Sequence, residues 1–379
     1  MGSSVAFFLS RNPDFDGTIL VVERDPTYEY SSTSRTNSCM RQQFSREVNI
    51  RISQFGAEFV RDFREWMDDP EAPEVAVNHF GYMYLAADEA AAAVLEANQR
   101  VQASLGAGTV IMTAAEIATA YPFYNVDGIV CGSHNPVDEG WWDSGTVFDW
   151  WRRQARRHGV EYVTDEVADI DRDGDVVTGV ELAAGSRVSC GALVNATGPR
   201  AARTAAMAGL ELPVEPRKRF TWIFEAAETL DQDLPLTIDP SGVHVRSDGP
   251  AYMAGCPPDV DPPVAHDDFD MDHDIFEEKV WPVLANRVPA FERIKVTSRW
   301  AGHYAYNYFD HNAVVGPHTE VGNFLFINGF SGHGMQQSPA MGRAVAELLC
   351  YGEYRTLDLS ELGYERIARG EPFIETAII

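Results

Sequence analysis

The sequence predicts an α/β fold, α+β overall, in which an open parallel sheet stands beside a second, mixed sheet. Two short apolar runs, residues 192–196 and 324–327, each lead into glycine, as strands do where an open α/β sheet places its ligands. Two other stretches, residues 81–136 and 216–311, are richer in proline, aromatic residues and short strand patterns. The apolar runs predict the parallel sheet, and the aromatic stretches predict the mixed sheet.

The composition excludes several classes of protein. Of 379 residues, 45% are hydrophobic, which is enough for a sizeable core in about two to three domains. No apolar run approaches the roughly 18 residues of a membrane-spanning helix and no signal peptide is recognisable, so we expect a cytoplasmic protein without an integral membrane segment. A net charge of −27 repels nucleic acid, and five scattered cysteines predict neither a disulfide framework nor a metal site.

The chain begins with a helical pattern that continues into a strand. Gly2 leads directly into the helix, and after Gly17 the apolar run 18–22 ends at the acid Glu23. A continuous apolar, β-branched run suits a parallel strand buried on both faces. Helix, strand and acid in this order form the back half of a Rossmann-like, dinucleotide-binding βαβ unit. Gly2 then matches the last glycine of G-x-G-x-x-G, and Glu23 matches the acid that accepts hydrogen bonds from ribose hydroxyls.

The front half of this unit is missing. Taken alone, a glycine before a helix and a glutamate after a strand often occur by chance. The first strand and two of the three glycines would have to precede Met1. We therefore expect translation to begin upstream, at an apolar strand that ends in Gly-x-Gly; a stop codon directly before the Met1 codon would contradict this.

The middle of the chain supplies further elements. Residues 144–158 carry two tryptophans on one apolar face, which predicts an amphipathic helix with both rings in the core. Residues 167–188 alternate polar and apolar side chains, with turns at 173–174 and 184–185, which predicts a β-meander. Residues 257–274 are crowded with Asp, Pro and His but lack compact ligand spacing, so we expect a solvated loop.

Residues 329–349 predict a glycine-rich loop followed by a helix. Ser338 suits the N-cap and Pro339 suits the first helical position. The free N–H groups and the positive end of the helix dipole face the loop 332–334, so we expect it to hold an anion or a ring that becomes anionic. A minor alternative is the nucleophile elbow of a hydrolase around Ser331, in which a histidine replaces the closing glycine.

Several motifs along the chain occur together in one family: the Gly2 helix with Glu23, Ser31-Ser32, Arg41-Gln42-Gln43-Phe44, Ala196-Thr197-Gly198-Pro199 and Gly329-Phe330-Ser331-Gly332-His333-Gly334. With them the chain resembles the D-amino-acid oxidase and sarcosine oxidase superfamily of FAD-dependent oxidoreductases along essentially its whole length.

Within this superfamily the chain is most similar to one branch, the bacterial relatives of FAD-dependent oxidoreductase domain-containing protein 1, a mitochondrial assembly factor of respiratory complex I. The motifs specific to the branch are Lys279-Val280-Trp281-Pro282, Arg287-Val288-Pro289-Ala290-Phe291, Trp300-Ala301-Gly302, Asn312-Ala313-Val314-Val315-Gly316-Pro317-His318 and the tail from Gly329 to Ile379. Such an ordered set indicates kinship more than it indicates a substrate.

The resemblance implies a division of the chain and a reaction. A FAD-binding domain of residues 1–80, 137–215 and 312–379 is interleaved with a substrate domain of residues 81–136 and 216–311. The implied reaction moves a hydride to flavin N5 from the carbon next to the nitrogen of a secondary or tertiary amine, or of an N-substituted amino acid. The implied partner is a small-molecule amine.

The resemblance also implies the site residues. The catalytic residues it implies are Arg41, His303, Tyr306 and His333. The residues it implies for FAD binding are Gly2, Ser3, Glu23, Arg24, Ser31, Ser32, Arg41, Gln42, Val167, Ala196, Thr197, Gly198, Gly329, Phe330, Gly332, His333, Gly334, Met335 and Gln336. Arg41 matches an arginine that clamps the substrate carboxylate, and a salt bridge that ties its loop to the domain is an equal alternative. For the aromatic side chains expected nearest the flavin, the alternative is a hydrogen-bonded position in the core. These side chains are His303, Tyr304, Tyr306 and His333.

Three departures from sarcosine oxidase favour a dehydrogenase over an oxidase. Gln336 stands where that enzyme has a second cationic ligand of the carboxylate. His303 aligns with the cysteine that attaches its flavin, so we expect non-covalent FAD. No lysine that could help activate oxygen lies near Tyr252 and Gly255. We expect electrons to pass to an acceptor protein or a quinone. The alternative is a flavin-binding assembly factor for a respiratory complex, with little or no turnover.

Overall fold

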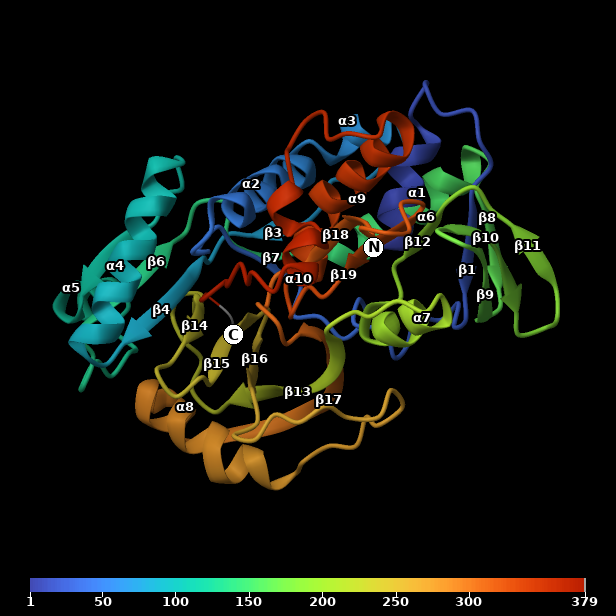
Figure 1. The fold of residues 1–379 in the computed structure, drawn as a ribbon. Coiled ribbons are helices and arrows are strands. Elements are labelled where there is room, and N and C mark those ends of the chain that lie inside the picture. Colours follow the sequence, from blue (N-terminus) through green and yellow to red (C-terminus); the bar gives the residue numbers. More distant parts are fainter. Residues whose placement is uncertain (378–379) are drawn as a thin grey trace.

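Strands from two separate stretches of the chain form the largest sheet of the computed structural model, which describes residues 1–377 (Figure 1). All neighbouring strands in this sheet are antiparallel except β14 and β4, which pair parallel, so the sheet is mixed as predicted. In spatial order its eight strands are β17 (Ile294–Asn307), β13 (Val214–Ala226), β16 (Ala251–Cys256), β15 (His244–Asp248), β14 (Leu236–Ile238), β4 (Tyr82–Ala86), β6 (Cys131–Asn135) and β5 (Val110–Thr113).

These strands lie within the predicted stretches 81–136 and 216–311, except that β13 begins at Val214. The elements that accompany the sheet are α4 (Glu89–Ser104), α5 (Ala114–Ala120), the π-helix η2 (Phe276–Val280), α8 (Trp281–Arg287) and the 3-10 helix η3 (Pro289–Glu292). Trp222 and Phe224 of β13 share one hydrophobic cluster with Leu284 and Phe291, so α8 and η3 close one face of the sheet.

The predicted parallel strands lie in two small sheets that are separate from the mixed sheet. The short strand β1 (Leu20–Glu23) pairs parallel with β8 (Glu161–Thr164), and β12 (Leu193–Asn195) pairs parallel with β19 (Phe324–Asn328), which also pairs antiparallel with β18 (Val314–Pro317). The apolar runs at 192–196 and 324–327 are therefore confirmed as parallel strands.

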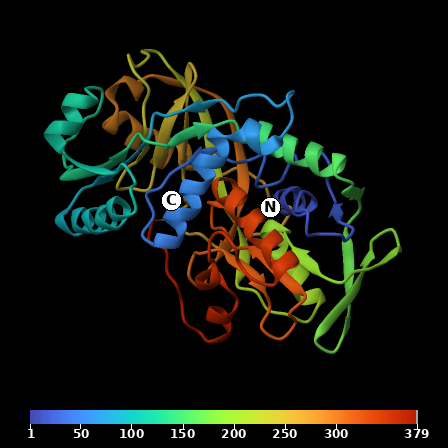
Figure 2. The same cartoon turned by 90° about the horizontal axis from the view of Figure 1, so that it is seen from above.

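Helices cover these small sheets, and Figures 1 and 2 both show α1 beside α6 and α9. Their aromatic residues, among them Phe7, Phe59 and Trp151, form one core cluster, so the predicted packing role of the tryptophans is confirmed. The helices are α1 (Gly2–Ser10), α2 (Glu47–Arg61), α3 (Phe63–Met67), α6 (Ser144–Arg157), α7 (Ala201–Met207), α9 (Gly334–Tyr351) and α10 (Glu365–Ala368), with 3-10 turns η1 (Gly198–Arg200) and η4 (Ser360–Leu362).

The remaining strands of the described residues form two further three-stranded sheets. The predicted meander is confirmed as the antiparallel ribbon β9 (Val167–Asp173), β10 (Val176–Leu182) and β11 (Arg187–Ser189), which projects to one side in Figure 2. A small sheet of β2 (Cys39–Met40), β7 (Gly140–Trp142) and β3 (Val77–Asn78) joins early and middle segments. Within residues 1–377, none of the helices combines the length and the apolar character needed to cross a bilayer.

The burial predicted for β1 is wrong. All four of its residues are only partly buried, because within residues 1–377 the strand has a single neighbour, β8. The expected strand upstream of Met1 stays a prediction. Of the predicted segment 312–379, residues 378–379 lie outside the described residues.

The predicted start of α9 is also wrong, because the helix begins at Gly334 and contains Pro339. A proline inside a helix normally leaves the carbonyl four residues earlier without a partner. Here the Ser338 hydroxyl donates to that carbonyl, Met335 O, at 2.6 Å. Ser338 therefore supports a longer helix instead of capping a shorter one.

The crossing of α1 and α9 is unusually close. A Cβ placed on Gly342 would lie 1.9 Å from the Ser4 Oγ and 2.7 Å from the Ser4 Cβ. The Ser4 hydroxyl donates to Ser338 O at 2.7 Å across the same contact. Glycine at position 342 therefore sets the spacing of the two helices.

We expect Gly342→Ala to destabilise the protein by about 1–3 kcal/mol, because the added methyl forces the helices apart. Urea unfolding of both proteins measures the difference. Gly322→Ala is the matched control, since no atom lies within 4 Å of a Cβ at that position. Equal stability of the two variants would contradict this account of the crossing.

A buried histidine in the mixed sheet predicts a dependence of stability on pH. Burial lowers the pKa of His244 from 6.5 to about 4. The unfolded chain therefore binds the proton more readily, and this contribution to stability is lost as the pH falls below 6.5. Relative to His244→Gln, the wild type should lose about 2 kcal/mol of unfolding free energy between pH 6.5 and 5. A difference that stays constant over this range would show that the ring titrates normally.

Candidate cofactor and substrate site

The amino end of α1 lies among the carboxyl ends of β1 and β12. A Cβ on Gly2 would lie 3.5 Å from the Ala196 Cβ, and Ser3 is buried. Burial lowers the pKa of the Met1 amino group to about 6. The nearby Glu23 carboxylate has the opposite, smaller effect on this pKa. Predicted residues from both strand ends therefore meet at one helix terminus.

Glu23 is oriented by its own turn. One of its carboxylate oxygens accepts from Asp25 N at 2.9 Å, and burial raises the pKa of the side chain. Asp165 N donates to the Glu23 carbonyl, which brings the next predicted residue, Val167 of β9, to this edge. The Arg24 guanidinium, 46% exposed, lies 4.0 Å from Glu166 and faces solvent.

The end of β12 forms a tight polar turn. Asn195 accepts from the Thr197 hydroxyl at 2.8 Å, and the Thr197 and Thr204 hydroxyls lie 3.0 Å apart. Gly198 has a φ of +56°, and no atom lies within 4 Å of a Cβ there. The turn therefore leaves open space beside its backbone.

The loop before α9 approaches β17 closely. Gly332 has a φ of +99°, and a Cβ there would lie 2.5 Å from the Tyr304 ring, so the loop tolerates no side chain. The Met1 side chain reaches to 3.4 Å from a Cβ on Gly334, which connects this loop to the start of α1. His333 N donates to Phe330 O at 2.9 Å, which closes the turn.

The structure gives no support to the hydrolase alternative. Ser331 is completely buried, and its hydroxyl accepts from Asn307 N at 3.1 Å. A nucleophilic serine needs an exposed hydroxyl next to a base. Ser331 instead ties the loop to the end of β17.

Arg41 is the central charged group near this loop. It is 1% exposed, and its Nη1 donates to the Tyr84 hydroxyl at 2.8 Å. Nη2 lies 2.8 Å from His333 Nε2 and also donates to Ala377 O. The Arg41 backbone N–H donates to the Gln336 side chain at 2.7 Å, so the predicted residues Arg41, His333 and Gln336 meet.

The charge of Arg41 is not balanced by these contacts. Its three guanidinium partners are a phenol, an imidazole and a main-chain carbonyl, and its Nε has no hydrogen-bond partner within residues 1–377. Burial, reinforced by Arg41, holds the pKa of His333 well below its usual range, so the ring is neutral and accepts from Nη2. A buried cation with neutral partners favours binding of an anion.

Glu139, which no sequence pattern marked as a site residue, fixes the loop that carries Arg41 by accepting hydrogen bonds from its neighbours Gln42 and Gln43. It is fully buried and accepts from Gln42 N at 2.6 Å, from the Gln43 side chain at 2.9 Å and from the Asn135 side chain at 3.0 Å. Burial raises its pKa to about 8, although all three donors favour the ionised form. Nothing in the local sequence pattern marks this acid, because two of its three partners, Gln42 and Gln43, come from a distant segment.

The structure does not bring all the predicted residues together. The His303 ring stacks on Phe269 at 4.2 Å and its Nε2 lies 2.7 Å from Asp268 O. Residues alternate along β17, so His303 points away from the face that carries Tyr304 and Tyr306. The Tyr306 ring lies under the Arg217 guanidinium. The catalytic roles of His303 and Tyr306 stay predictions.

One of the two predicted serines, Ser32, is hydrogen-bonded to the main chain of β17. The Ser32 hydroxyl donates to the His303 carbonyl at 2.6 Å, and the Ser31 hydroxyl donates to Tyr28 O at 2.9 Å. The serine loop is thus fixed against β17, the strand that carries Tyr304.

Taken together, the geometry suits an extended dinucleotide cofactor. The α1 terminus offers N–H groups for a pyrophosphate, and Glu23 offers a free oxygen for ribose hydroxyls. At the other end, the α9 terminus and Gly332 allow a planar ring to approach the backbone. The close approach of Gly332 to Tyr304 explains why position 332 lacks a side chain, whereas a Cβ on Gly2 would make only an ordinary contact with Ala196.

Comparison with known proteins supports this assignment. The family model for FAD dependent oxidoreductases matches residues 1–348. FAD-dependent oxidoreductase domain-containing protein 1 is 38% identical in Xenopus laevis, over 100% of this chain and 83% of the relative. The protein of the same name from Bos taurus is 37% identical, over 100% of this chain and 85% of the relative.

Solved structures share the fold. L-proline dehydrogenase from P. horikoshii superposes with a TM-score of 0.85 at 24% identity, covering 98% of this chain and 96% of that one. Glycine oxidase from Geobacillus kaustophilus superposes with a TM-score of 0.79 at 18% identity, covering 95% and 94%. The expected resemblance is therefore confirmed by sequence and by fold: the chain belongs to the family of FAD-dependent oxidoreductases, and its cofactor is FAD.

Proposed function

We propose that this protein is an FAD-dependent dehydrogenase that oxidises the carbon next to the nitrogen of an N-substituted amino acid or a related secondary or tertiary amine. Bound flavin supplies the chemistry, which is acceptance of a hydride at N5. The eight-stranded sheet is the body of the substrate domain, 81–136 and 216–311, and the remaining segments bind FAD non-covalently.

One observation carries the proposal: Arg41 is a buried cation that has no charged hydrogen-bond partner within residues 1–377, and it lies beside the loop that would receive the flavin ring. Its free Nε and an adjacent Nη form the fork that matches a carboxylate. The names of two structural neighbours, L-proline dehydrogenase and glycine oxidase, also point to amino acid substrates. A substrate with a carboxylate next to its amine is therefore favoured.

The side chains around Arg41 orient this fork. Tyr84 accepts from Nη1, and burial raises the pKa of Tyr84, so its hydroxyl keeps its proton and can donate to the substrate. Neutral His333 holds Nη2 without neutralising it. The Phe44 ring lies 4.3 Å from the guanidinium and keeps water away from one of its faces. Together these contacts place a carboxylate, and hence the neighbouring C–H bond, in one position.

A dehydrogenase accounts for the residues better than an oxidase. The Gln336 side chain accepts a hydrogen bond from the Arg41 backbone N–H, and being neutral it supplies no second positive charge for a substrate carboxylate. Lys218 and Lys279 form ion pairs with Asp268 and Asp259, and Lys295 is exposed on β17. None of the three lysines of the chain therefore lies at Arg41 to assist reduction of oxygen. The electrons would pass to an acceptor protein or a quinone.

We expect candidate amines to bleach the bound flavin under anaerobic conditions, because the proposed reaction reduces it without oxygen. The panel contains sarcosine, dimethylglycine and proline, and the 450 nm region is followed by stopped flow. The alternative is a flavin-binding assembly factor for a respiratory complex. Absence of bleaching across the panel, together with co-purification of a membrane complex, would favour that alternative.

We expect Arg41→Lys to lower kcat/KM for a carboxylate-bearing substrate by about a hundredfold, on the order of 3 kcal/mol, because lysine cannot form the fork. An amine that lacks the carboxylate should be affected less than about threefold. Reductive half-reaction rates with both substrate types measure the effect. Arg299→Lys, at an exposed position of β17, is the control. Equal losses for both substrate types would rule out Arg41 as the clamp.

A further inference from the structure

The carboxyl-terminal segment 371–377 crosses the site and contacts Arg41 directly. In Figure 1 this segment leaves α10 and runs between α2 and the eight-stranded sheet. The carbonyl of Ala377 accepts a hydrogen bond from Arg41 Nη2, the same nitrogen that a substrate carboxylate would use. The contact therefore places part of the chain itself in the proposed position of the substrate.

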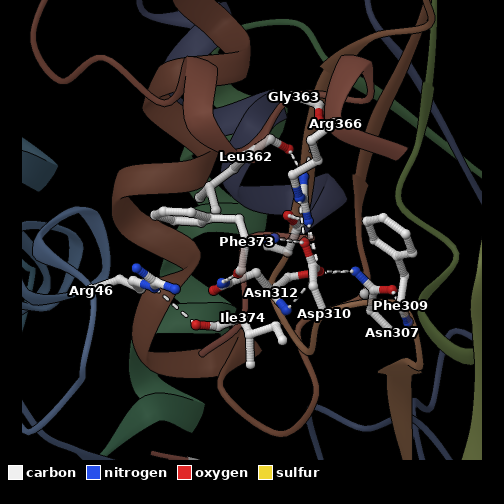
Figure 3. Close-up of polar contacts among 12 residues, drawn as sticks. Arg46, Asn307, Phe309, Asp310, Asn312, Leu362, Gly363, Arg366, Phe373 and Ile374 are labelled. Atoms are coloured by element: carbon white, nitrogen blue, oxygen red, sulfur yellow. Dashed lines mark hydrogen bonds and ion pairs between the residues drawn. The ribbon is translucent and has the colours of Figure 1, made fainter. Parts of the chain in front are cut away.

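A buried ion pair fixes the beginning of the segment (Figure 3). Asp310 is fully buried and accepts from Arg366 Nε at 2.6 Å and from Phe373 N at 3.0 Å. Asn312 donates to the Phe373 carbonyl, and the Arg46 guanidinium donates to the Ile374 carbonyl at 2.8 Å (Figure 3). Removing one partner of such a pair leaves a buried charge, so this part of the segment is held firmly.

A second anchor lies at Glu375, which is 1% exposed. Its carboxylate accepts from Ser45 N at 2.9 Å, from the Ser45 hydroxyl at 2.6 Å and from the Asn49 side chain at 2.9 Å. It also accepts from Arg46 N at 3.3 Å, which places a negative charge at the amino end of α2. Because Arg41 lies just before α2, this anchor ties the tail to the loop that carries the clamp.

Residues 376–377 make fewer described contacts than Glu375 does. Thr376 is exposed, and its N–H donates to the Ser45 hydroxyl at 3.2 Å. Ala377 N donates to Glu375 within the segment, and Ala377 O accepts from Arg41. Residues 376–377 can therefore move off Arg41 without breaking either anchor.

We propose that residues 376–377 form a latch over Arg41 that a carboxylate ligand displaces. In the closed state Nη2 donates to the neutral Ala377 carbonyl, and in the open state it donates to the carboxylate oxygen. The exchange replaces a neutral acceptor by an anion at a buried cation, which favours opening only for ligands with negative charge. The inference rests on the proposed role of Arg41 as the carboxylate clamp and adds the group against which a substrate competes.

The test measures binding to the FAD-loaded protein without turnover. The probes are 2-furoate and, as a neutral isostere, 2-furamide, titrated while the flavin absorption spectrum is followed. A variant that ends at Glu375 should bind 2-furoate about tenfold more tightly than the full chain, because the cost of opening is removed. Binding of 2-furamide should stay unchanged. Unchanged or weaker binding of 2-furoate by a folded variant would overturn the proposal. The proposal would also be overturned if 2-furoate bound neither the full chain nor the shortened variant.

A second variant keeps the full length of the chain. Glu375→Gln replaces an acceptor by a donor at the α2 anchor and should also tighten binding of 2-furoate. Exposed Glu371→Gln is the control and should leave it unchanged. Hydrogen exchange at the Ala377 amide should accelerate when 2-furoate binds, and an equal or slower rate would show that the latch stays closed.

These outcomes are separate from those of the proposed function. Failure of every amine to bleach the flavin would remove the dehydrogenase assignment. Tighter binding of 2-furoate by the shortened chain would still establish the latch.

Discussion

A buried guanidinium whose hydrogen-bond partners in the described part of the chain are all uncharged is the constraint around which the site is arranged. Arg41 is 1% exposed, and burying an unpaired charge is costly unless hydrogen bonds and polarisable rings surround it. Tyr84, His333 and the carbonyl of Ala377 supply the hydrogen bonds, and Phe44 supplies the ring. None of these groups removes the charge, so the site retains its attraction for an anion beside the loop 332–334.

This arrangement requires four distant segments of the chain to meet. The helix α1 carries the terminus proposed to bind the cofactor, and its close crossing with α9 at Ser4 and Gly342 sets the position of the Gly332 loop. Through Gln336 the first turn of α9 holds the Arg41 backbone, and through Glu375 the tail holds the start of α2. The spacing of two helices is thereby linked to the position of Arg41.

Local sequence patterns predicted much of the fold because they report on local geometry. The meander, the helix 144–157 and the parallel strands β12 and β19 follow from periodicity and from glycines at strand ends. Two predictions failed where a tertiary contact overrode the pattern. Ser338 satisfies the carbonyl that Pro339 leaves free, so α9 extends to Gly334, and β1 is only partly buried because it has a single neighbour within residues 1–377.

The sequence by itself determined the family, the cofactor and the residues with a fixed place in a motif, such as Gly2, Glu23 and the 332–334 loop, because each lies next to a strand or helix end that local patterns reveal. Only the tertiary structure decided what surrounds Arg41. Tyr84 and Ala377 reach it from a strand and the tail, Glu139 holds the neighbouring Gln42 backbone, and no periodicity or spacing encodes such encounters. It also turned the His303 ring toward Phe269, because the direction of a side chain in a strand depends on register, which pairing with β13 sets.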